Sequence, residues 1–352
     1  MSYELDRIMR SILRKILHRR WLTFRPNKEP FISLVVIIYN MEREAPRTLY
    51  TLTPEYQNRN PDSYEVLVID NGSTTPFGKQ RVEAMSKNFR YFYLNNAAPS
   101  PAYALNWGAR HARGECLGFM IDGARMLSPG ILYFTQKAFK AYKNPVINTL
   151  AFHLGEKIQK LAMLEGYNQQ LEDILLDSVP WRENGYALFN ISCFAGSSKY
   201  GWFAPIAECN CIFLRRTLFN QMNGFDEGFD LPGGGLVNLD FYKRAVTFKG
   251  AEPIMILGEG SFHQFHNGSM TGKVGEDSRK EMEKYRKQYL KLTGQEFEMP
   301  FIRYEYLGHT PSLSFKFMEE SLKGVELLKT SFPKEAEVLM VSSINSMKGS
   351  QN

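Results

Sequence analysis

Polar side chains stand where several buried strands are expected to end. The run YEVLVID finishes at Asp70, CLGFMID finishes at Asp122, and FISLVVIIYN finishes at Tyr39 and Asn40. The apolar residues of these runs are continuous, as in strands covered on both faces by helices. Because ligands of α/β proteins bind at the carboxyl ends of such strands, these residues are expected to face one crevice. Asp70 also has a structural explanation, an Asx turn or a cap for the next helix.

Two further groups of residues have types and spacing that suit chemistry. His263 and His266 come at the end of the last apolar run, where imidazoles suit either ligand binding or local hydrogen bonds. A helix after a run of three glycines carries Asn238, Asp240 and Arg244. Asp240 is therefore either a functional carboxylate or a first-turn carboxylate that stabilises the helix and pairs with Arg244 at i+4.

The elements that position these residues read as an α/β fold. The runs that end at Asn40 and Asp70 are about 30 residues apart, which suits a βαβ unit. Strand and helix signals alternate from residue 31 to about residue 150, and RYFYLNN adds a third strand. Helices are expected over residues 79–88, 102–112, 156–176 and 277–292.

The whole chain sets wider bounds. Its 352 residues suffice for one large α/β domain with additions, or for two domains. The four cysteines include one CxC and no paired CxxC set, which favours neither a zinc ribbon nor a disulfide framework. No run of eighteen apolar residues and no standard signal peptide is present, so a reducing cytoplasm is the expected setting.

The amino-terminal segment is strongly basic. Residues 1–25 hold seven Lys or Arg and two acids, and so carry +5 of the formal net charge of +6. Aliphatic residues recur there at steps of three and four, which predicts a basic amphipathic helix. Such a helix suits an anionic membrane surface, or packing on the domain or on a second copy. Nucleic acid is not expected as a partner, because no aromatic stacking platform or known binding motif accompanies the charge.

Read in order, LVVIIYN, LVIDNGST, ALNWGARHARGECLGFMID, the NGFDE turn and the Asp/Arg helix before a His-bearing strand resemble the family 2 glycosyltransferases. The resemblance covers residues 31–268. It implies the GT-A fold, a Rossmann-like mixed sheet flanked by helices, between the amphipathic helix of residues 1–25 and a helical extension over residues 269–352. It also implies a nucleotide-sugar donor. The donor-binding residues carried over are Tyr39, Asn40, Glu42, Asp70, Asn106, Asp122 and Arg125.

The metal site of that family departs from its usual form in this chain. Where the family usually has a DXD triplet, the sequence reads Asp122, Gly123, Ala124, followed by Arg125. The resemblance implies that a divalent cation, Mn²⁺ or Mg²⁺, binds Asp122 with His263 or His266. The other possibility is that Arg125 lies near the diphosphate and takes over part of the role of the cation.

The position of the catalytic base is also altered. Inverting members of the family use an aspartate in an ED pair ahead of a helix, and alignment on Arg244 puts Asn238 at that position. An amide is not a general base at neutral pH. Asp240 and Glu208 are therefore the two candidates for the catalytic base.

The resulting expectation is an inverting glycosyltransferase that is cytoplasmic and peripheral on the inner face of the membrane. Its acceptor would be a glycan or a lipid-linked sugar, as in surface polysaccharide assembly. The alternative is a non-catalytic GT-A-like protein that binds nucleotide sugar or glycan as a partner in a complex. A nicotinamide-dependent or methyl-transfer enzyme is disfavoured, because the first strand lacks a GxGxxG turn.

Overall fold

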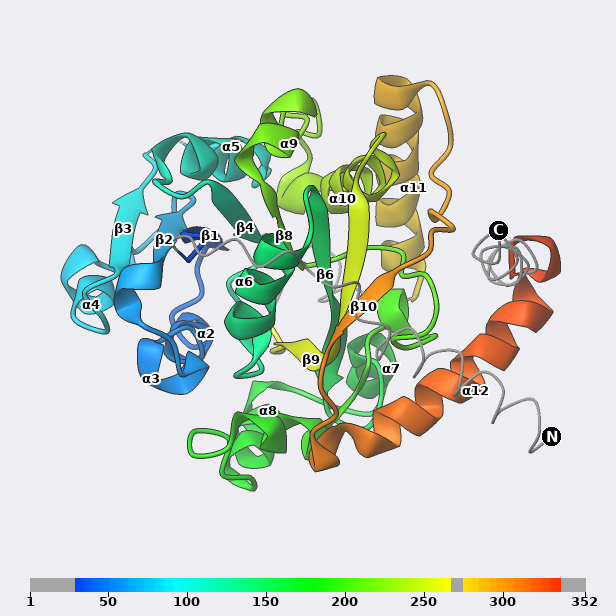
Figure 1. The fold of residues 1–352 in the computed structure, drawn as a ribbon, viewed down its shortest axis with the longest axis horizontal. Coiled ribbons are helices and arrows are strands. Elements are labelled where there is room, and N and C mark those ends of the chain that lie inside the picture. Colours follow the sequence, from blue (N-terminus) through cyan, green and yellow to red (C-terminus); the bar gives the residue numbers. More distant parts are fainter. Residues whose placement is uncertain (1–28, 96, 267–274, 337–352) are drawn as a thin grey trace, which may run out of the picture.

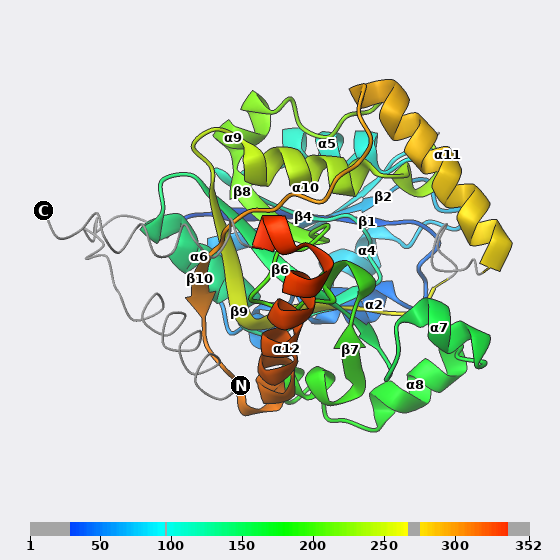
Figure 2. The same ribbon diagram turned by 90° about the vertical axis from the view of Figure 1, so that its right-hand side faces the viewer.

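The computed structural model describes residues 29–95, 97–266 and 275–336. These residues form a ten-stranded mixed sheet with helices on both faces (Figures 1 and 2). Eight strands follow one another in space in the order β10 (Glu305–Gly308), β9 (Glu252–His263), β6 (Pro145–Leu154), β8 (Cys211–Arg215), β4 (Cys116–Met120), β1 (Ile32–Ile38), β2 (Tyr64–Asp70) and β3 (Phe89–Tyr93). Off this path, β5 (Arg125–Leu127) pairs with β9, and β7 (Ser192–Phe194) pairs with β6.

The helices connect and cover these strands. They are α2 (Ala45–Tyr50), α3 (Pro54–Gln57), α4 (Lys79–Glu83), α5 (Ala102–His111), α6 (Ile131–Ala141), α7 (Gln159–Leu164), α8 (Gln169–Asp177), α9 (Arg216–Gln221), α10 (Val237–Thr247), α11 (Gly275–Thr293) and α12 (Phe315–Ser331). Short 3-10 turns occupy Pro61–Ser63, Gly185–Ile191, Gly196–Ser198, Pro232–Gly234 and Ser312–Ser314.

One half of the sheet is parallel. Strand β1 pairs in parallel with both β2 and β4, and the register sets Ile38 beside Asp70 and Val36 beside Met120. Because parallel strands end at the same edge, the residues that follow β1, β2 and β4 meet there. Asn40, Asp70 and Asp122 therefore come from neighbouring strand ends, as the sequence predicts.

The other half of the sheet brings the end of β9 to the same region. Strand β9 lies parallel to β6 and antiparallel to the short β5. The register sets His263 opposite Arg125 on β5 and opposite His153 on β6. Since β5 begins three residues after Asp122, this pairing carries His263 to the Asp122 turn.

Side chains of β1 alternate between two apolar cores. Val35 and Ile37 belong to the core that includes α5 and α10, whereas Leu34 and Val36 belong to the core that includes α2 and α6. Helix α5 approaches the sheet closely at Gly108, where a Cβ would lie 2.5 Å from Val35 Cγ1. The strand is thus buried on both faces, which explains its unbroken apolar run.

The prediction of a single helix over residues 156–176 is wrong. The segment forms two helices, α7 and α8, separated by Gly166 at a φ of 92°. Asn168 then caps α8, because its side chain accepts hydrogen bonds from the backbone N–H groups of Gln170 and Leu171. A glycine in the left-handed region and an Asn N-cap are both helix boundaries that the apolar periodicity does not reveal.

The carboxy-terminal part is helical, with α11 and α12, but also supplies a strand that was not predicted. Strand β10 pairs in parallel with β9 and extends the sheet at that edge. Helix α12 packs on the rest of the chain, where Ser321 Oγ accepts a hydrogen bond from Trp202 N at 3.1 Å. The domain boundary expected at residues 268 and 269 stays a prediction.

The amphipathic helix predicted over residues 1–25 lies outside the described residues. Within the described parts of the chain, no helix combines the length and the apolar character that crossing a bilayer requires.

Candidate active site

A cavity of about 1520 Å³ opens beside the ends of β1, β2 and β4. Residues of α7, α10 and α11 also line it. The predicted site residues that line the cavity are Tyr39, Asn40, Asp122, Arg125, Glu208, His263 and His266. The predicted site residues that do not line it are Glu42, Asp70, Asn106 and Asp240.

Asp122, His263 and His266 converge in the wall of this cavity. The Oδ2 atom of Asp122 lies 2.8 Å from His263 Nε2 and 3.3 Å from His266 Nε2. The two imidazole nitrogens lie 3.1 Å apart. The turn that carries Asp122 packs tightly on β1, since a Cβ at Gly123 would lie 2.5 Å from Ile38 Cγ2.

The orientation of His263 follows from its contact with Gln159 of α7. Gln159 Nε2 donates to the backbone oxygen of His263 at 3.0 Å, which leaves Gln159 Oε1 facing His263 Nδ1 at 2.8 Å. Nδ1 therefore carries the proton, and Nε2 presents its lone pair to the Asp122 carboxylate. A lone pair facing a carboxylate oxygen requires a positive group between them, either a proton on His266 or a bound cation.

The pKa values in this cluster reflect the same electrostatics. Burial disfavours the charged form of Asp122, but the nearby His266 and His263 outweigh it and hold its pKa well below the usual range. Burial, together with the charge of Arg125, lowers the pKa of His263 to about 4. Burial also opposes protonation of His266, yet the Asp122 carboxylate prevails and raises its pKa.

The three atoms fit a divalent cation. Octahedral Mg²⁺ holds its ligands at about 2.0–2.1 Å, so adjacent ligands lie about 2.8–3.0 Å apart. The observed separations of 2.8, 3.1 and 3.3 Å match that spacing, with the longer ones suiting a slightly larger ion. A set of two imidazoles and one carboxylate favours Mn²⁺ over Mg²⁺, which prefers oxygen ligands.

Arg125 is a second positive group at this position. Its side chain is nearly buried, lines the cavity, and has one guanidinium nitrogen 3.8 Å from Asp122 Oδ2. Its Nε atom is buried and has no hydrogen-bond partner among the described residues. A buried donor without a partner is costly in a protein, so Arg125 has hydrogen-bonding capacity left for an anion in the cavity.

Asp70 is fully buried, and both of its carboxylate oxygens accept hydrogen bonds from neighbouring residues. Oδ1 accepts from Ser73 N at 2.9 Å, and Oδ2 accepts from Phe77 N at 2.9 Å and from Tyr91 O–H at 2.7 Å. These contacts build the turn after β2. The structural explanation for Asp70 is thus the one that its contacts favour.

The residue next to Asp70 faces the cavity instead. Asn71 donates from Nδ2 to Ala98 O at 3.0 Å, and its buried Oδ1 atom has no partner among the described residues. Tyr39, which is 52 % exposed, and Asn40 line the same part of the cavity. Asn40 adopts a positive φ of 50°, and its side-chain oxygen accepts from Thr74 N at 2.9 Å.

Glu42 and Asn106 lie away from the cavity. Glu42 is exposed and forms an ion pair with Arg81. Asn106 holds the NGFDE turn, because its side chain accepts from Phe225 N at 2.9 Å and donates to Phe225 O and Glu227 at 2.8 Å. The contacts of both residues thus give a structural reason for a glutamate at position 42 and an asparagine at position 106.

The two candidate bases lie in different surroundings. Glu208 is half-buried and lines the cavity, where Asn238 Nδ2 donates to its Oε2 at 2.8 Å. The same amide nitrogen donates to Asn210 Oδ1 at 2.8 Å. Asp240 instead accepts from Arg244 Nε at 2.7 Å, outside the cavity. Burial raises the pKa of Asp240 while Arg244 opposes the rise.

Sequence reasoning missed three residues of the site. Asn71 and Asn210 each follow a predicted site residue by one or two positions, and that adjacency was the available signal. Gln159 had no such signal, because its contact with His263 joins residues 104 positions apart.

Comparisons with known proteins agree with this reading of the fold. Residues 33–121 match the model of glycosyl transferase family 2. That segment runs from the second residue of β1 through β4 and ends one residue before Asp122. The resemblance seen in the sequence is confirmed over this segment, and the mixed sheet flanked by helices has the GT-A fold. No curated protein sequence matches the chain.

Among solved structures, the chain is similar to S. aureus TarS 1–349, with 16% identity, a TM-score of 0.42, and coverage of 74% of this chain and 65% of that chain. TarS 1–349 in complex with UDP-GlcNAc has 16% identity and a TM-score of 0.45, and the match covers 74% of this chain and 66% of that chain. The mannosyltransferase PcManGT from Pyrobaculum calidifontis in complex with GDP-Man and Mn²⁺ has 17% identity and a TM-score of 0.45. This match covers 99% of this chain and 86% of that chain. The chain thus spans slightly less than two thirds of the TarS fragment.

Proposed function

We propose that this chain transfers a sugar from a nucleotide-sugar donor to an acceptor hydroxyl within the 1520 Å³ cavity. One observation carries the proposal. The cluster of Asp122, His263 and His266 and the carboxylate of Glu208 line the same cavity, in a chain whose residues 33–121 match the model of glycosyl transferase family 2. Glycosyl transfer needs both parts, a positive group for the leaving diphosphate and a base for the acceptor.

The donor would bind on the side of the parallel strands. Asn71 Oδ1 and Tyr39 offer a hydrogen-bond acceptor and an aromatic surface for the nucleoside. Arg125 offers donors to the diphosphate. A divalent cation held by Asp122, His263 and His266 would stabilise the negative charge that develops on the leaving group.

Glu208 is the proposed general base. A carboxylate beside the acceptor hydroxyl removes its proton as the hydroxyl oxygen attacks the anomeric carbon, in a single displacement with inversion. Asn238 Nδ2 fixes one oxygen of Glu208, and the other oxygen is left for the acceptor. Asp240 is proposed to stabilise α10 through Arg244 rather than to act on substrate.

The finer features stay proposals that rest on the sequence. A hexosyl donor, a glycan or lipid-linked acceptor and a role in surface polysaccharide assembly are consistent with this site. Attachment to the inner face of a membrane depends on residues 1–25. The division into a transferase domain over residues 31–268 and an extension over residues 269–352 is likewise proposed.

Calorimetric titration with nucleoside diphosphates, with and without Mn²⁺, tests the proposal. We expect at least one nucleotide to bind, and to bind more tightly with Mn²⁺. Failure of every nucleotide to bind would overturn both donor binding and transfer. The substituted positions Ala124 and Asn238 favour one alternative, a protein that binds donor without turnover. Nucleotide binding without release of nucleoside diphosphate from any donor in the presence of acceptors would support that alternative.

A further inference from the structure

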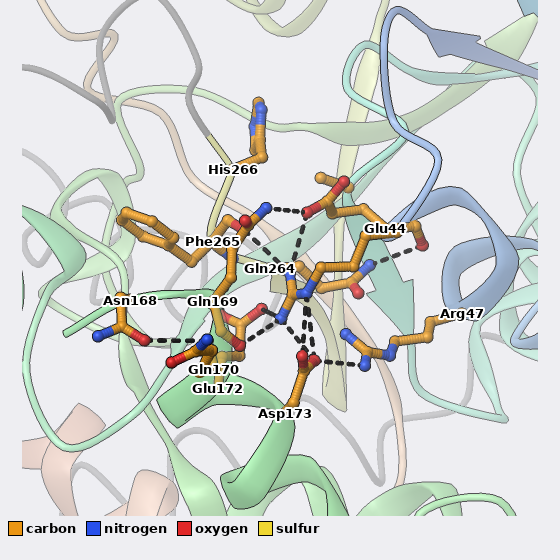
Figure 3. Close-up of polar contacts among 12 residues, drawn as sticks. Glu44, Arg47, Asn168, Gln169, Gln170, Glu172, Asp173, Gln264, Phe265 and His266 are labelled. Atoms are coloured by element: carbon orange, nitrogen blue, oxygen red, sulfur yellow. Dashed lines mark hydrogen bonds and ion pairs between the residues drawn. The ribbon is translucent and has the colours of Figure 1, made fainter.

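The backbone immediately before His266 is held by side chains from distant parts of the chain (Figure 3). The N–H group of Phe265 donates to Glu172 Oε2 at 2.7 Å. The carbonyl oxygen of Phe265 accepts from an Arg43 guanidinium nitrogen at 3.2 Å. Both backbone polar groups of Phe265 are therefore bound by charged side chains, which make stronger hydrogen bonds than neutral ones.

Glu172 is suited to this task because it is fully buried. It lies on α8, and its second oxygen accepts from Arg43 at 3.2 Å. Tyr167 O–H donates to the same oxygen that binds Phe265, at 3.2 Å. A carboxylate with no exposed surface needs such partners, since burial without them disfavours its charge. The buried Glu172 and the partly buried Arg43 thus form a charge pair around the Phe265 backbone.

Arg43 joins this pair to the rest of the site. It precedes α2 and donates to Glu44 Oε1 at 2.9 Å, to Gln169 O at 2.9 Å and to Asp173 Oδ1 at 2.7 Å. Glu44 and Gln169 both line the cavity, and Gln169 Nε2 also donates to Glu44 at 2.9 Å. Figure 3 shows Glu44, Gln169 and Asp173 gathered in one place, close to Glu172 and Phe265.

The residue before Phe265, Gln264, is also held by hydrogen bonds. Its backbone N–H donates to Ala124 O at 2.8 Å, in the turn that carries Asp122. Its buried side chain donates to Glu44 O and to Thr48 Oγ1, each at 3.1 Å. Residues 264 and 265 are therefore tied both to the Asp122 turn and to helices α2 and α8.

We propose that Glu172 and Arg43 are positioning residues that set the backbone of Phe265 so that His266 Nε2 meets Asp122 Oδ2 and His263 Nε2 at the spacing a divalent cation requires. The inference deepens the proposed function, because it rests on a cation at that cluster. Of the three ligands, His263 lies on a strand and is oriented by Gln159. His266 lies three residues past His263, beyond the strand, and directly follows the residue whose backbone Glu172 and Arg43 hold.

If Glu172, Arg43 and their ion-pair partners only held α8 on the domain, a different result would be expected. Loss of any of these ion pairs would then lower the free energy of unfolding without a specific effect on Mn²⁺ affinity. Asp173 allows this distinction, because it follows Glu172 on α8 and binds Arg43 and Arg47 but makes no contact with Phe265. Asp173→Asn is therefore the matched control for Glu172→Gln.

The test measures Mn²⁺ binding to the full chain by electron paramagnetic resonance of free Mn²⁺, without nucleotide, together with thermal unfolding. The side chain of Glu172→Gln can turn its oxygen toward Phe265 N–H and Tyr167 O–H or toward Arg43, but its NH₂ group then faces the other side. We expect Mn²⁺ affinity to fall at least about 10-fold, the range usual for groups that orient metal ligands. Asp173→Asn should leave Mn²⁺ affinity within about twofold, a difference too small for the loss of an orienting group.

Arg43→Lys gives an independent second variant, because lysine keeps the charge but loses the fork that spans Phe265 O and the three carboxylates of Glu44, Glu172 and Asp173. We expect it to weaken Mn²⁺ binding as well. Wild-type affinity in both folded variants, or an equal loss in Asp173→Asn, would overturn the positioning role alone. A wild-type chain that binds no Mn²⁺ would overturn the cation site itself, and this inference with it.

Discussion

Asn238 Nδ2 donates a hydrogen bond to Glu208 Oε2 at 2.8 Å, so the amide at the expected position of the catalytic base orients a carboxylate from another segment. The two residues are 30 positions apart in the sequence. Asn210 Oδ1 accepts from the same nitrogen, which fixes the orientation of the amide. The cavity therefore contains a carboxylate next to the position where the sequence comparison predicts the base.

The first prediction concerns Asn238→Asp. A second carboxylate at this distance disfavours the charge on Glu208, and therefore raises the apparent pKa of the pair. We expect the acidic limb of the pH profile of kcat/KM to move to higher pH, with activity at pH 6 falling more than activity at pH 8. A profile that coincides with that of the wild type would contradict the coupling of these two residues.

The second prediction concerns the cation. Asp122→Asn removes the charged ligand from the cluster, and we expect Mn²⁺ affinity to fall at least about 10-fold, since an orienting group alone accounts for that much. Equilibrium dialysis against Mn²⁺ measures the change. Asp226→Asn is a suitable control, because Asp226 is exposed and its oxygen only accepts from Gly228 N. An equal effect of both substitutions would argue against a site at Asp122.

The third prediction separates Asp70 from Asn71. Asp70→Ala leaves two buried N–H groups and a buried hydroxyl without their acceptor, so the free energy of unfolding should fall by about 2–4 kcal/mol. Asn71→Ala should weaken nucleotide binding roughly 3- to 10-fold, as expected for one hydrogen bond, with a smaller effect on stability. Denaturant unfolding and nucleotide titration measure the two effects. The reverse pattern would assign nucleoside binding to Asp70.

The fourth prediction concerns pH and His153. Burial lowers the pKa of His153 well below its usual range, and its Nδ1 accepts from Gln159 N at 3.0 Å. The unfolded chain therefore binds a proton below about pH 6.5 that the folded chain does not bind, and stability falls as the pH is lowered. One such group contributes a slope of up to about 1.4 kcal/mol per pH unit.

His153→Asn tests this assignment, because the Asn side-chain oxygen can take the place of Nδ1 as the acceptor. When a chelator is present to remove metal ions, we expect the free energy of unfolding of the variant to depend less steeply on pH between 6.5 and 5 than that of the wild type. His263 also has a lowered pKa and keeps part of the slope in the variant. Equal slopes for variant and wild type would mean that His153 is not buried in its neutral form.

Much of the fold follows from the sequence because the parallel strands are buried on both faces. Unbroken apolar runs located β1, β2 and β4, and their polar ends located Asn40 and Asp122. The unpredicted strand β10 has only four residues, and its pairing with β9 depends on a contact about fifty positions away. Neither apolar periodicity nor turn residues reveal such a pairing.

The site was harder to predict than the fold. Residues two apart on a helix differ by about 200° around its axis, so Asn238 and Asp240 cannot both face the cavity. That rule favours Glu208 once Asn238 is placed in the cavity, but the sequence alone does not say which side of α10 faces inward. The contacts that hold the Phe265 backbone, next to His266, come from Arg43 and Glu172, which are 222 and 93 positions away from it, and no local pattern reports them.

Acceptor-dependent release of nucleoside diphosphate by Glu208→Gln and Asp240→Asn tests most directly whether Glu208 is the catalytic base. It is measured with a donor that the wild type turns over and a panel of saccharide acceptors. We predict that Glu208→Gln keeps donor affinity within about threefold of the wild type, while its release rate falls about 100-fold or more, as for loss of a general base. Asp240→Asn should retain turnover. Wild-type release by Glu208→Gln would contradict the account.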